Sequence, residues 1–260
     1  MIRRNTERIH PIADQLFIDL GIYDLQGLLR EQDKNICGVE CYQLGDGEIF
    51  SLPITETEIQ RYYFCKALGI PYYIITSSPT HKTFQIYCLD ESVANLIHLS
   101  TFNEAEFLQW WARQQSFNQK KAMYEAADRI SSSYIDKLLF SNNLAWGVNI
   151  DGFKLSPQRK IEYILEKRVT SRYNVRTYDP NNFFHGTQQK SGDYPSWRIL
   201  KHLADSLNVP LILATFDTNS SSIGITRILD VSAQHGLTYS NQIAVYNNST
   251  EIQKFLSQII

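Results

Sequence analysis

The chain has 260 residues, of which 43% are hydrophobic and 20% charged, as is usual for a globular protein with one large or two small domains. Its net charge of −2 excludes a protein that binds polyanions through overall charge alone. The apolar runs are too short to span a bilayer, and the N-terminal MIRRNTERIH lacks the apolar core of a signal peptide. We therefore expect a cytoplasmic protein without a membrane partner.

The charges are unevenly distributed along the chain. Residues 1–118 contain nine Lys and Arg against 15 Asp and Glu, a local charge of −6. Residues 119–176 contain 11 Lys and Arg against six Asp and Glu, a local charge of +5. A basic segment in an otherwise acidic chain points to a nucleic acid partner.

Apolar periodicity and turn signals predict alternating helices and strands in the first part of the chain. A helical stripe over 6–20 is followed by the strand NICGVECYQL, an Asp46-Gly47 turn and the short strand EIFSL. Thr55 and Glu58 form a capping box that opens a helix through Leu68. The strands IPYYIIT and TFQIYCL and a helix over 103–114 come next.

The second part of the chain shows a similar alternation. We expect a long helix over 119–140, a hairpin over 147–168, a polar loop, a helix over 194–207, the strands VPLILATF and SIGITRIL, and a terminal helix.

Charged residues gather at the end of the predicted hairpin. Side chains two apart on a strand share a face, so Glu166 and Arg168 point the same way, and Asp151 can join them from the neighbouring strand. Two carboxylates suit Mg²⁺ or Mn²⁺, and a cation beside them suits a phosphate. The same residues also fit an ordinary turn and a solvated strand end, and Glu162, on the face of Glu166, is an alternative metal ligand.

Further cations lie near this hairpin and in the polar loop that follows it. They are candidate contacts to nucleic acid, with His185 as a further candidate base or phosphate ligand: Lys154, Arg172, Arg176, His185 and Lys190.

The two halves of the chain repeat one pattern. ETEIQRYYFCKALGIPYYIITSSPTHKTFQIYCLD in the first half matches PSWRILKHLADSLNVPLILATFDTNSSSIGITRILD in the second. Each reads as a helix, an Ile-Pro or Val-Pro step into an apolar strand, a polar turn, a second strand and Leu-Asp. A duplicated unit is the simplest account, and each copy is expected to be a mixed sheet flanked by helices.

The order of elements resembles that of the PD-(D/E)xK, or restriction-endonuclease-like, nucleases: a helix, a strand with Asp, a hairpin, a strand with Glu-x-Lys, a helix and a strand. The resemblance covers roughly residues 119–231 and rests on Asp151 and on Glu166, Lys167 and Arg168. It implies an α/β protein of two tandem units, a degenerate one over 1–116 and one over 117–260 with the active site.

This chain departs from the family pattern at the cation. Arg168 stands where the family has lysine, and Lys167 comes one residue earlier, where strand alternation turns it to the opposite face. In the first copy Glu40, Cys41 and Tyr42 occupy the matching place, with no cation and only the distant Asp24 as partner. That copy is expected to be inactive.

The resemblance implies a metal-dependent nuclease that hydrolyses phosphodiester bonds, with DNA as the favoured substrate. Asp151 and Glu166 would bind Mg²⁺ or Mn²⁺, and Arg168 with Lys167 would offset charge on the phosphoryl oxygens. The alternative is a catalytically inactive nucleic-acid-binding or protein-interaction module of the same fold. The sequence leaves the choice between DNA and RNA, the cleavage specificity and the formation of a homodimer open.

Overall fold

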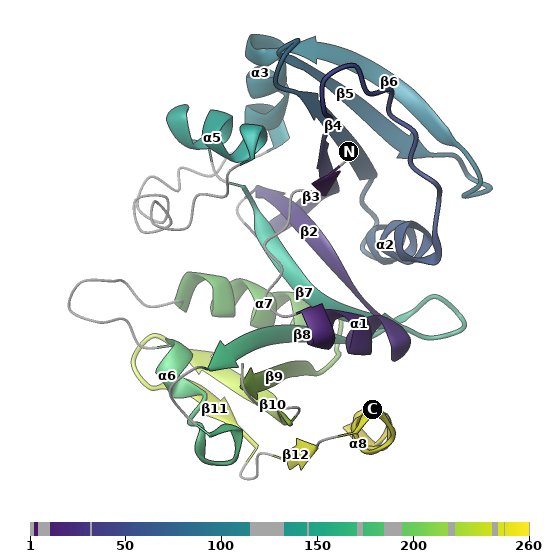
Figure 1. The fold of residues 1–260 in the computed structure, drawn as a ribbon. Coiled ribbons are helices and arrows are strands. Elements are labelled where there is room, and N and C mark those ends of the chain that lie inside the picture. Colours follow the sequence, from purple (N-terminus) through teal and green to yellow (C-terminus); the bar gives the residue numbers. More distant parts are fainter. Residues whose placement is uncertain are drawn as a thin grey trace. The chain divides into compact units, whose positions relative to one another are not determined.

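The structure is a computed structural model that describes residues 3–4, 11–31, 33–114, 133–144, 146–170, 174–184, 194–217, 222–240, 244–246 and 248–259. It has a mixed α/β fold, drawn in Figure 1. The described strands are β1 (Arg3–Arg4), β2 (Ile22–Glu31), β3 (Lys34–Gln43), β4 (Tyr72–Ser78), β5 (Thr83–Leu89), β6 (Leu96–Asn103), β7 (Val148–Leu155), β8 (Ile161–Thr170), β9 (Leu211–Asp217), β10 (Ile223–Ser232), β11 (Gly236–Tyr239) and β12 (Ala244–Tyr246). The described helices are α1 (Pro11–Asp19), α2 (Glu56–Ala67), α3 (Glu104–Gln114), α5 (Tyr134–Ser141), the 3-10 helix η2 (Val175–Thr177), α6 (Asn181–Phe184), α7 (Tyr194–Ser206) and α8 (Ser249–Ile259).

The chain divides into two compact units. Unit 1 comprises Met1–Glu7 and Leu25–Asn149, and unit 2 comprises Arg8–Asp24 and Ile150–Ile260. This division differs from the expected boundary between residues 116 and 117, because α1 and α5 pack away from their sequence neighbours. Phe17 of α1 belongs to the core of unit 2, whereas Ile135 and Leu139 of α5 belong to the core of unit 1.

In unit 1 the strands pair in the order of the sequence. β2 and β3 form an antiparallel hairpin, β4 lies parallel to β3, and β5 and β6 follow as antiparallel neighbours. The parallel step needs a crossover, which α2 supplies. Strand alternation separates the two faces: Cys37, Val39 and Cys41 enter the core with α3 and α5, and the side chains between them turn to the opposite face.

Aromatic side chains fill the core of unit 1. The rings of Phe84 and Phe107 stack with their centroids 4.1 Å apart, and Trp111 lies 5.6 Å from Phe107. Trp111 is fully buried, so its ring is part of the packed core of unit 1.

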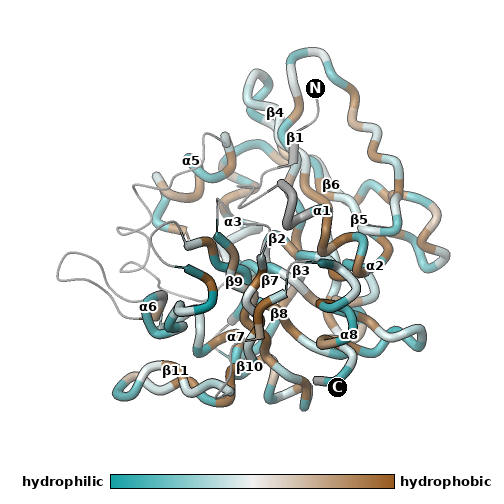
Figure 2. Tube along the Cα trace, turned by 60° about the horizontal axis from the view of Figure 1, so that its bottom comes forward, coloured by the Kyte–Doolittle hydropathy of each residue, from teal (hydrophilic) through white to brown (hydrophobic). Residues whose placement is uncertain are grey.

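Unit 2 shows the same order of pairings. β7 and β8 are antiparallel, β9 lies parallel to β8 after the crossover helix α7, and β10 and β11 follow as antiparallel neighbours. Tyr163 and Leu165 of β8 pack with α1 and α8 in the core. Figure 2 shows the apolar stretches along these strands in brown.

One expected element is contradicted by the structure. Residues 48–52 are not a strand, because β3 pairs with β2 and β4 instead. β2 and β6 are additional strands that the turn signals did not predict. Of the expected helix over 119–140, residues 119–132 lie outside the described residues. α5 covers the rest of that helix from Tyr134 onward. Among the described helices, none is long and apolar enough to cross a membrane.

Candidate active site

The predicted hairpin of unit 2 is confirmed, and its pairing ends where the candidate site begins. Lys154 pairs with Tyr163, Phe153 with Ile164, and Gly152 with Leu165. The pair of Gly152 and Leu165 is the one nearest the candidate site. A Cβ added to Gly152 would lie 3.0 Å from side-chain atoms of both Ile22 and Leu165. Glycine therefore lets β7 approach its neighbours closely, directly beside Asp151.

Asp151 bridges the two strands beyond the last pair. Its Oδ2 accepts a hydrogen bond of 3.0 Å from the backbone N–H of Lys167. Burial raises the pKa of Asp151, whereas the Lys167 charge, this N–H and the Arg168 charge oppose the rise. Asp24, which belongs to unit 2, adds to it as a second negative charge. Asp151 is therefore a carboxylate in a desolvated place whose ionised form depends on nearby cations.

Glu166 and Arg168 form an ion pair on the face of β8 that α7 covers. Arg168 Nη2 lies 2.7 Å from Glu166 Oε1, as expected for residues two apart on a strand. The guanidinium carbon lies 5.5 Å from the ring centroid of Trp197 on α7, a cation–π distance. Trp197 is fully buried, so it holds the guanidinium against the helix.

Lys167 lies on the opposite face of β8. Its Nζ is 5.5 Å from the ring centroid of Phe17 on α1, and the residue is only 8% exposed. Its charge is nevertheless the largest of the effects that lower the pKa of Asp151. The two cations thus approach the site from the two faces of one strand.

Arg168 influences both carboxylates. It is ion-paired with Glu166, and its charge opposes the rise that burial causes in the pKa of Asp151. Within the part of the chain that the structure describes, no group of three or more His, Cys, Asp or Glu residues could hold a metal ion. The donor set fits Mg²⁺ or Mn²⁺, because such ions commonly bind through one or two carboxylates and complete their octahedron with water.

Glu162 does not join this group. It precedes Glu166 by four residues, about 13 Å along the strand. Its negative charge raises the pKa of Lys154, opposing the lowering that burial causes, which places it toward the turn of the hairpin.

Lys154 faces α1 instead of an open surface. Its Nζ donates a hydrogen bond of 2.6 Å to the carbonyl oxygen of Leu20, just after α1 ends at Asp19. A cation there satisfies a carbonyl at the negative end of the helix. In the structure Lys154 therefore caps the C-terminal end of α1.

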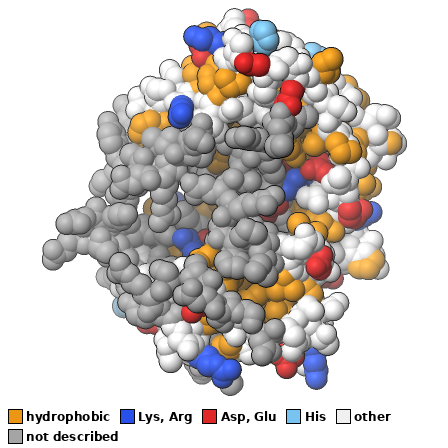
Figure 3. All heavy atoms as spheres, in the orientation of Figure 1, with side chains coloured by type: hydrophobic (Ala, Val, Ile, Leu, Met, Phe, Trp, Pro, Cys, Tyr) orange, Lys and Arg blue, Asp and Glu red, His pale blue; other side chains and the backbone are white. Residues whose placement is uncertain are grey.

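Among the other expected nucleic acid contacts, Arg176 lies on η2 with an exposed side chain, and its backbone N–H donates to Asn174. Arg172, His185 and Lys190 lie outside the described residues. On the face shown in Figure 3, the Lys and Arg side chains that are coloured occur singly or in small groups.

We expect Lys154→Met to destabilise unit 2 without weakening DNA binding. The variant loses one charge-assisted hydrogen bond to α1, so its free energy of unfolding should fall by about 1–2 kcal/mol in urea denaturation. Lys160→Met, at an exposed position in the hairpin turn, is the matched control and should change stability by less than about 0.5 kcal/mol. Unchanged stability with reduced DNA affinity would instead make Lys154 a phosphate contact.

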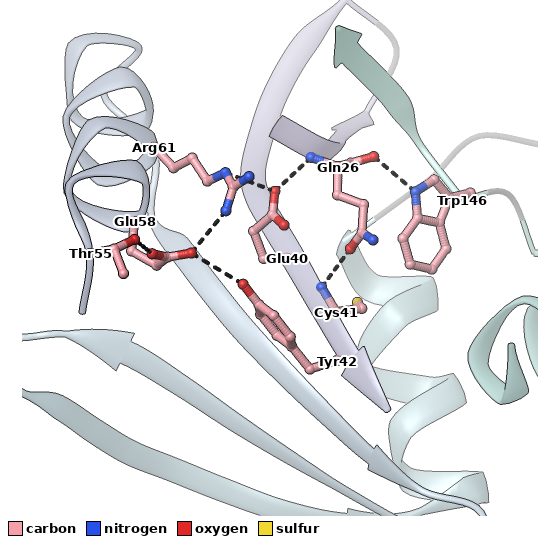
Figure 4. Close-up of polar contacts among 8 residues, drawn as sticks. All are labelled: Gln26, Glu40, Cys41, Tyr42, Thr55, Glu58, Arg61 and Trp146. Carbon is pink, nitrogen blue, oxygen red and sulfur yellow. Dashed lines mark hydrogen bonds and ion pairs between the residues drawn. The ribbon is translucent and has the colours of Figure 1, made fainter. Parts of the chain in front are cut away.

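Unit 1 has a counterpart of this site, drawn in Figure 4. The hairpin pairing of β2 and β3 ends at Gly27 and Val39, and the preceding Gln26 bridges the strands. Its Oε1 accepts a 2.6 Å hydrogen bond from the N–H of Cys41, and its own N–H donates to Glu40 Oε1 at 2.7 Å. Gln26, and not Asp24, is therefore the partner of Glu40.

Glu40 of unit 1 is part of a buried network with helix α2. Arg61 Nε lies 3.3 Å from Glu40, and Arg61 Nη1 lies 2.9 Å from Glu58 Oε1. Tyr42 and Thr55 each donate a hydroxyl hydrogen bond to Glu58. Glu40 and Arg61 are 0% and 3% exposed, so these charges are neutralised inside the protein (Figure 4).

Comparisons with known proteins identify no family. No protein-family model matches the chain, and no curated protein does. A crystal structure of a sex pheromone precursor from Lactobacillus salivarius subsp. salivarius UCC118 aligns over 80% of this chain and 62% of that chain, with 6% identity. The TM-score of this alignment is 0.13.

Proposed function

We propose that the protein is a metal-dependent nuclease with its catalytic centre in unit 2 and DNA as its substrate. The observation that carries the proposal is geometric: Asp151 and Glu166 each lie one residue beyond the hairpin pair of Gly152 with Leu165, and Arg168 is ion-paired with Glu166. Two carboxylates can hold a metal ion that activates water, and nearby cations can offset charge on the phosphoryl oxygens during phosphodiester hydrolysis. The basic segment over 119–176 favours a nucleic acid as the phosphodiester.

We also infer that the two units are tandem restriction-endonuclease-like copies. Both have an antiparallel hairpin, a crossover helix, a parallel strand and then antiparallel strands. In both, a polar residue directly before a glycine bridges the hairpin where its pairing ends. Shared register at a functional position supports duplication more strongly than the order of elements alone.

Each residue of the site has a role in this proposal. Asp151 and Glu166 would hold Mg²⁺ or Mn²⁺, which when bound lowers the pKa of a water and neutralises phosphoryl oxygens. Arg168 cannot act as a base, because a guanidinium stays protonated in proteins. It would hold a phosphate oxygen from its position beside the Trp197 ring, and Lys167 would favour the ionised form of Asp151.

One observation favours a second candidate, an inactive nucleic-acid-binding or protein-interaction module. Glu166 is already bonded to Arg168, so this carboxylate has a partner inside the protein before any metal binds. In the inactive module this ion pair would be structural, and Glu166 would bind no metal.

The test is plasmid cleavage by the wild-type protein with Mg²⁺, with Mn²⁺ and with EDTA. We expect cleavage with either metal and none with EDTA, together with DNA affinity that falls steeply as salt rises. DNA binding without cleavage under any metal would support the inactive nucleic-acid-binding module. Neither binding nor cleavage would support the protein-interaction module.

A further inference from the structure

We propose that the guanidinium of Arg61 occupies in unit 1 the place that a divalent cation takes in unit 2, so that the chain has a single catalytic centre. The proposal rests on the proposed function of unit 2. It concerns the buried network of Figure 4, to which the proposed function of unit 2 assigns no role.

Strand register makes Glu40 the counterpart of Glu166. The parallel pairs recorded for β3 and β4 begin at Gly38 with Tyr72, and Glu40 lies two positions further. Those for β8 and β9 begin at Ile164 with Leu211, and Glu166 lies two positions further. The two glutamates thus occupy equivalent places on equivalent strands.

Gln26 is likewise the counterpart of Asp151. Each precedes the glycine at the last recorded hairpin pair, and each side chain accepts the N–H of the residue after the glutamate. The amide is neutral where Asp151 is a carboxylate, so the hairpin of unit 1 supplies one carboxylate where the hairpin of unit 2 supplies two.

The crossover helices differ at one decisive position. Arg61 lies 11 residues before Tyr72, where the recorded parallel pairing begins, and Leu200 lies 11 residues before Leu211 in unit 2. Leu200 is buried and apolar, so α7 brings no charge to the site at this position, and the guanidinium that pairs with Glu166 comes from Arg168 of β8 itself. In unit 1, α2 brings a permanent cation instead.

Arg61 contacts carboxylate oxygens, which are also the ligands that Mg²⁺ and Mn²⁺ prefer. Two carboxylates face it, Glu40 at 3.3 Å and Glu58 at 2.9 Å, and all three residues are at most 5% exposed. An arginine in this place keeps its positive charge, because a guanidinium does not lose its proton in proteins. A divalent cation would have to displace a buried, doubly paired charge, which is strongly unfavourable.

A single centre determines the product of cleavage. Each binding event can break one phosphodiester bond, so duplex DNA should first be nicked. Cutting of the opposite strand then needs a second event or a second copy of the chain.

The metal arm of the test uses a protein whose unit 2 carboxylates are neutralised, Asp151→Asn/Glu166→Gln. Mn²⁺ binding is followed by the electron paramagnetic resonance signal of free Mn²⁺. We expect no binding by this protein, about one Mn²⁺ per chain after adding Arg61→Met, and none again after adding Glu40→Gln. The proposal would be overturned if the starting protein bound Mn²⁺ and Glu40→Gln abolished that binding. It would also be overturned if the protein with Arg61→Met added were folded and bound no Mn²⁺.

The cleavage arm covers the case in which Arg61→Met does not fold, and it uses the wild-type protein and supercoiled plasmid in excess. We expect open circles to accumulate before linear molecules, and we expect Arg61→Met/Glu40→Gln, where folded, to cut at the wild-type rate. If linear plasmid formed without prior open circles at this excess of plasmid, the proposal of a single catalytic centre would be overturned. Absence of any cleavage would reject the proposed function of unit 2, while the Mn²⁺ result for Arg61 would stand independently.

Discussion

Glu166→Gln is expected to lower the rate of Mg²⁺-dependent cleavage by roughly 10²–10³-fold, the usual cost of removing a group that stabilises charge in the transition state. Glutamine keeps the size of Glu166 and can still accept a hydrogen bond from Arg168, which lies 2.7 Å away. What the variant loses is the negative charge that would hold the metal in the proposed site. Single-turnover cleavage with Mg²⁺ measures this loss, and DNA affinity in EDTA should stay the same or increase.

Glu162→Gln is the matched control for this prediction. It makes the same chemical change on the same strand, about 13 Å from Glu166. Its cleavage rate should stay within about twofold of the wild type. If Glu162→Gln abolished cleavage and Glu166→Gln did not, the metal site would lie toward the hairpin turn and the assignment of Asp151 and Glu166 would be wrong.

The hairpin of unit 2 could be predicted because local signals specify it. Residues 147–168 combine two apolar runs with a polar turn, and side chains two apart on a strand necessarily share a face. The pairing of Glu166 with Arg168 follows from that geometry alone. Asp151 could be placed near them because antiparallel neighbours in a short hairpin have a restricted register.

β2 could not be predicted from its pattern. Residues 25–30 are all buried, so the run LQGLLR shows neither the alternation of a half-buried strand nor a helical stripe. Its Gln26 was therefore missed as the counterpart of Asp151. The available signal was the repeat of a polar residue before glycine, Gln26-Gly27 and Asp151-Gly152, beside two buried glutamates.

The sequence pattern also could not predict that α1 packs in the core of unit 2 and α5 in the core of unit 1. A helical apolar stripe shows that one face of α1 is buried, but it does not say against which strands. Phe17 of α1 would fit either core by size and polarity. The choice depends on contacts between residues far apart in the chain, such as Phe17 with Leu165, which residue spacing does not encode.

Arg61→Met should have the largest effect on stability, lowering the free energy of unfolding by about 3–5 kcal/mol, because breaking a buried ion pair leaves an uncompensated charge inside the protein. Glu40 is 0% exposed and would keep its negative charge beside Glu58. Adding Glu40→Gln should recover most of the loss, since an uncharged amide can accept the N–H of Gln26 in its place.

Urea denaturation of the wild type, both single variants and the double variant gives the coupling free energy between Arg61 and Glu40. Arg113→Met, at an exposed position on α3, should change stability by less than about 0.5 kcal/mol and so controls for the general loss of an arginine. A double variant as unstable as the sum of the two single variants would show that the guanidinium and Glu40 are not coupled. That result would also remove the reason for treating Arg61 as the internal cation of unit 1, because a cation that neutralises Glu40 must be coupled to it.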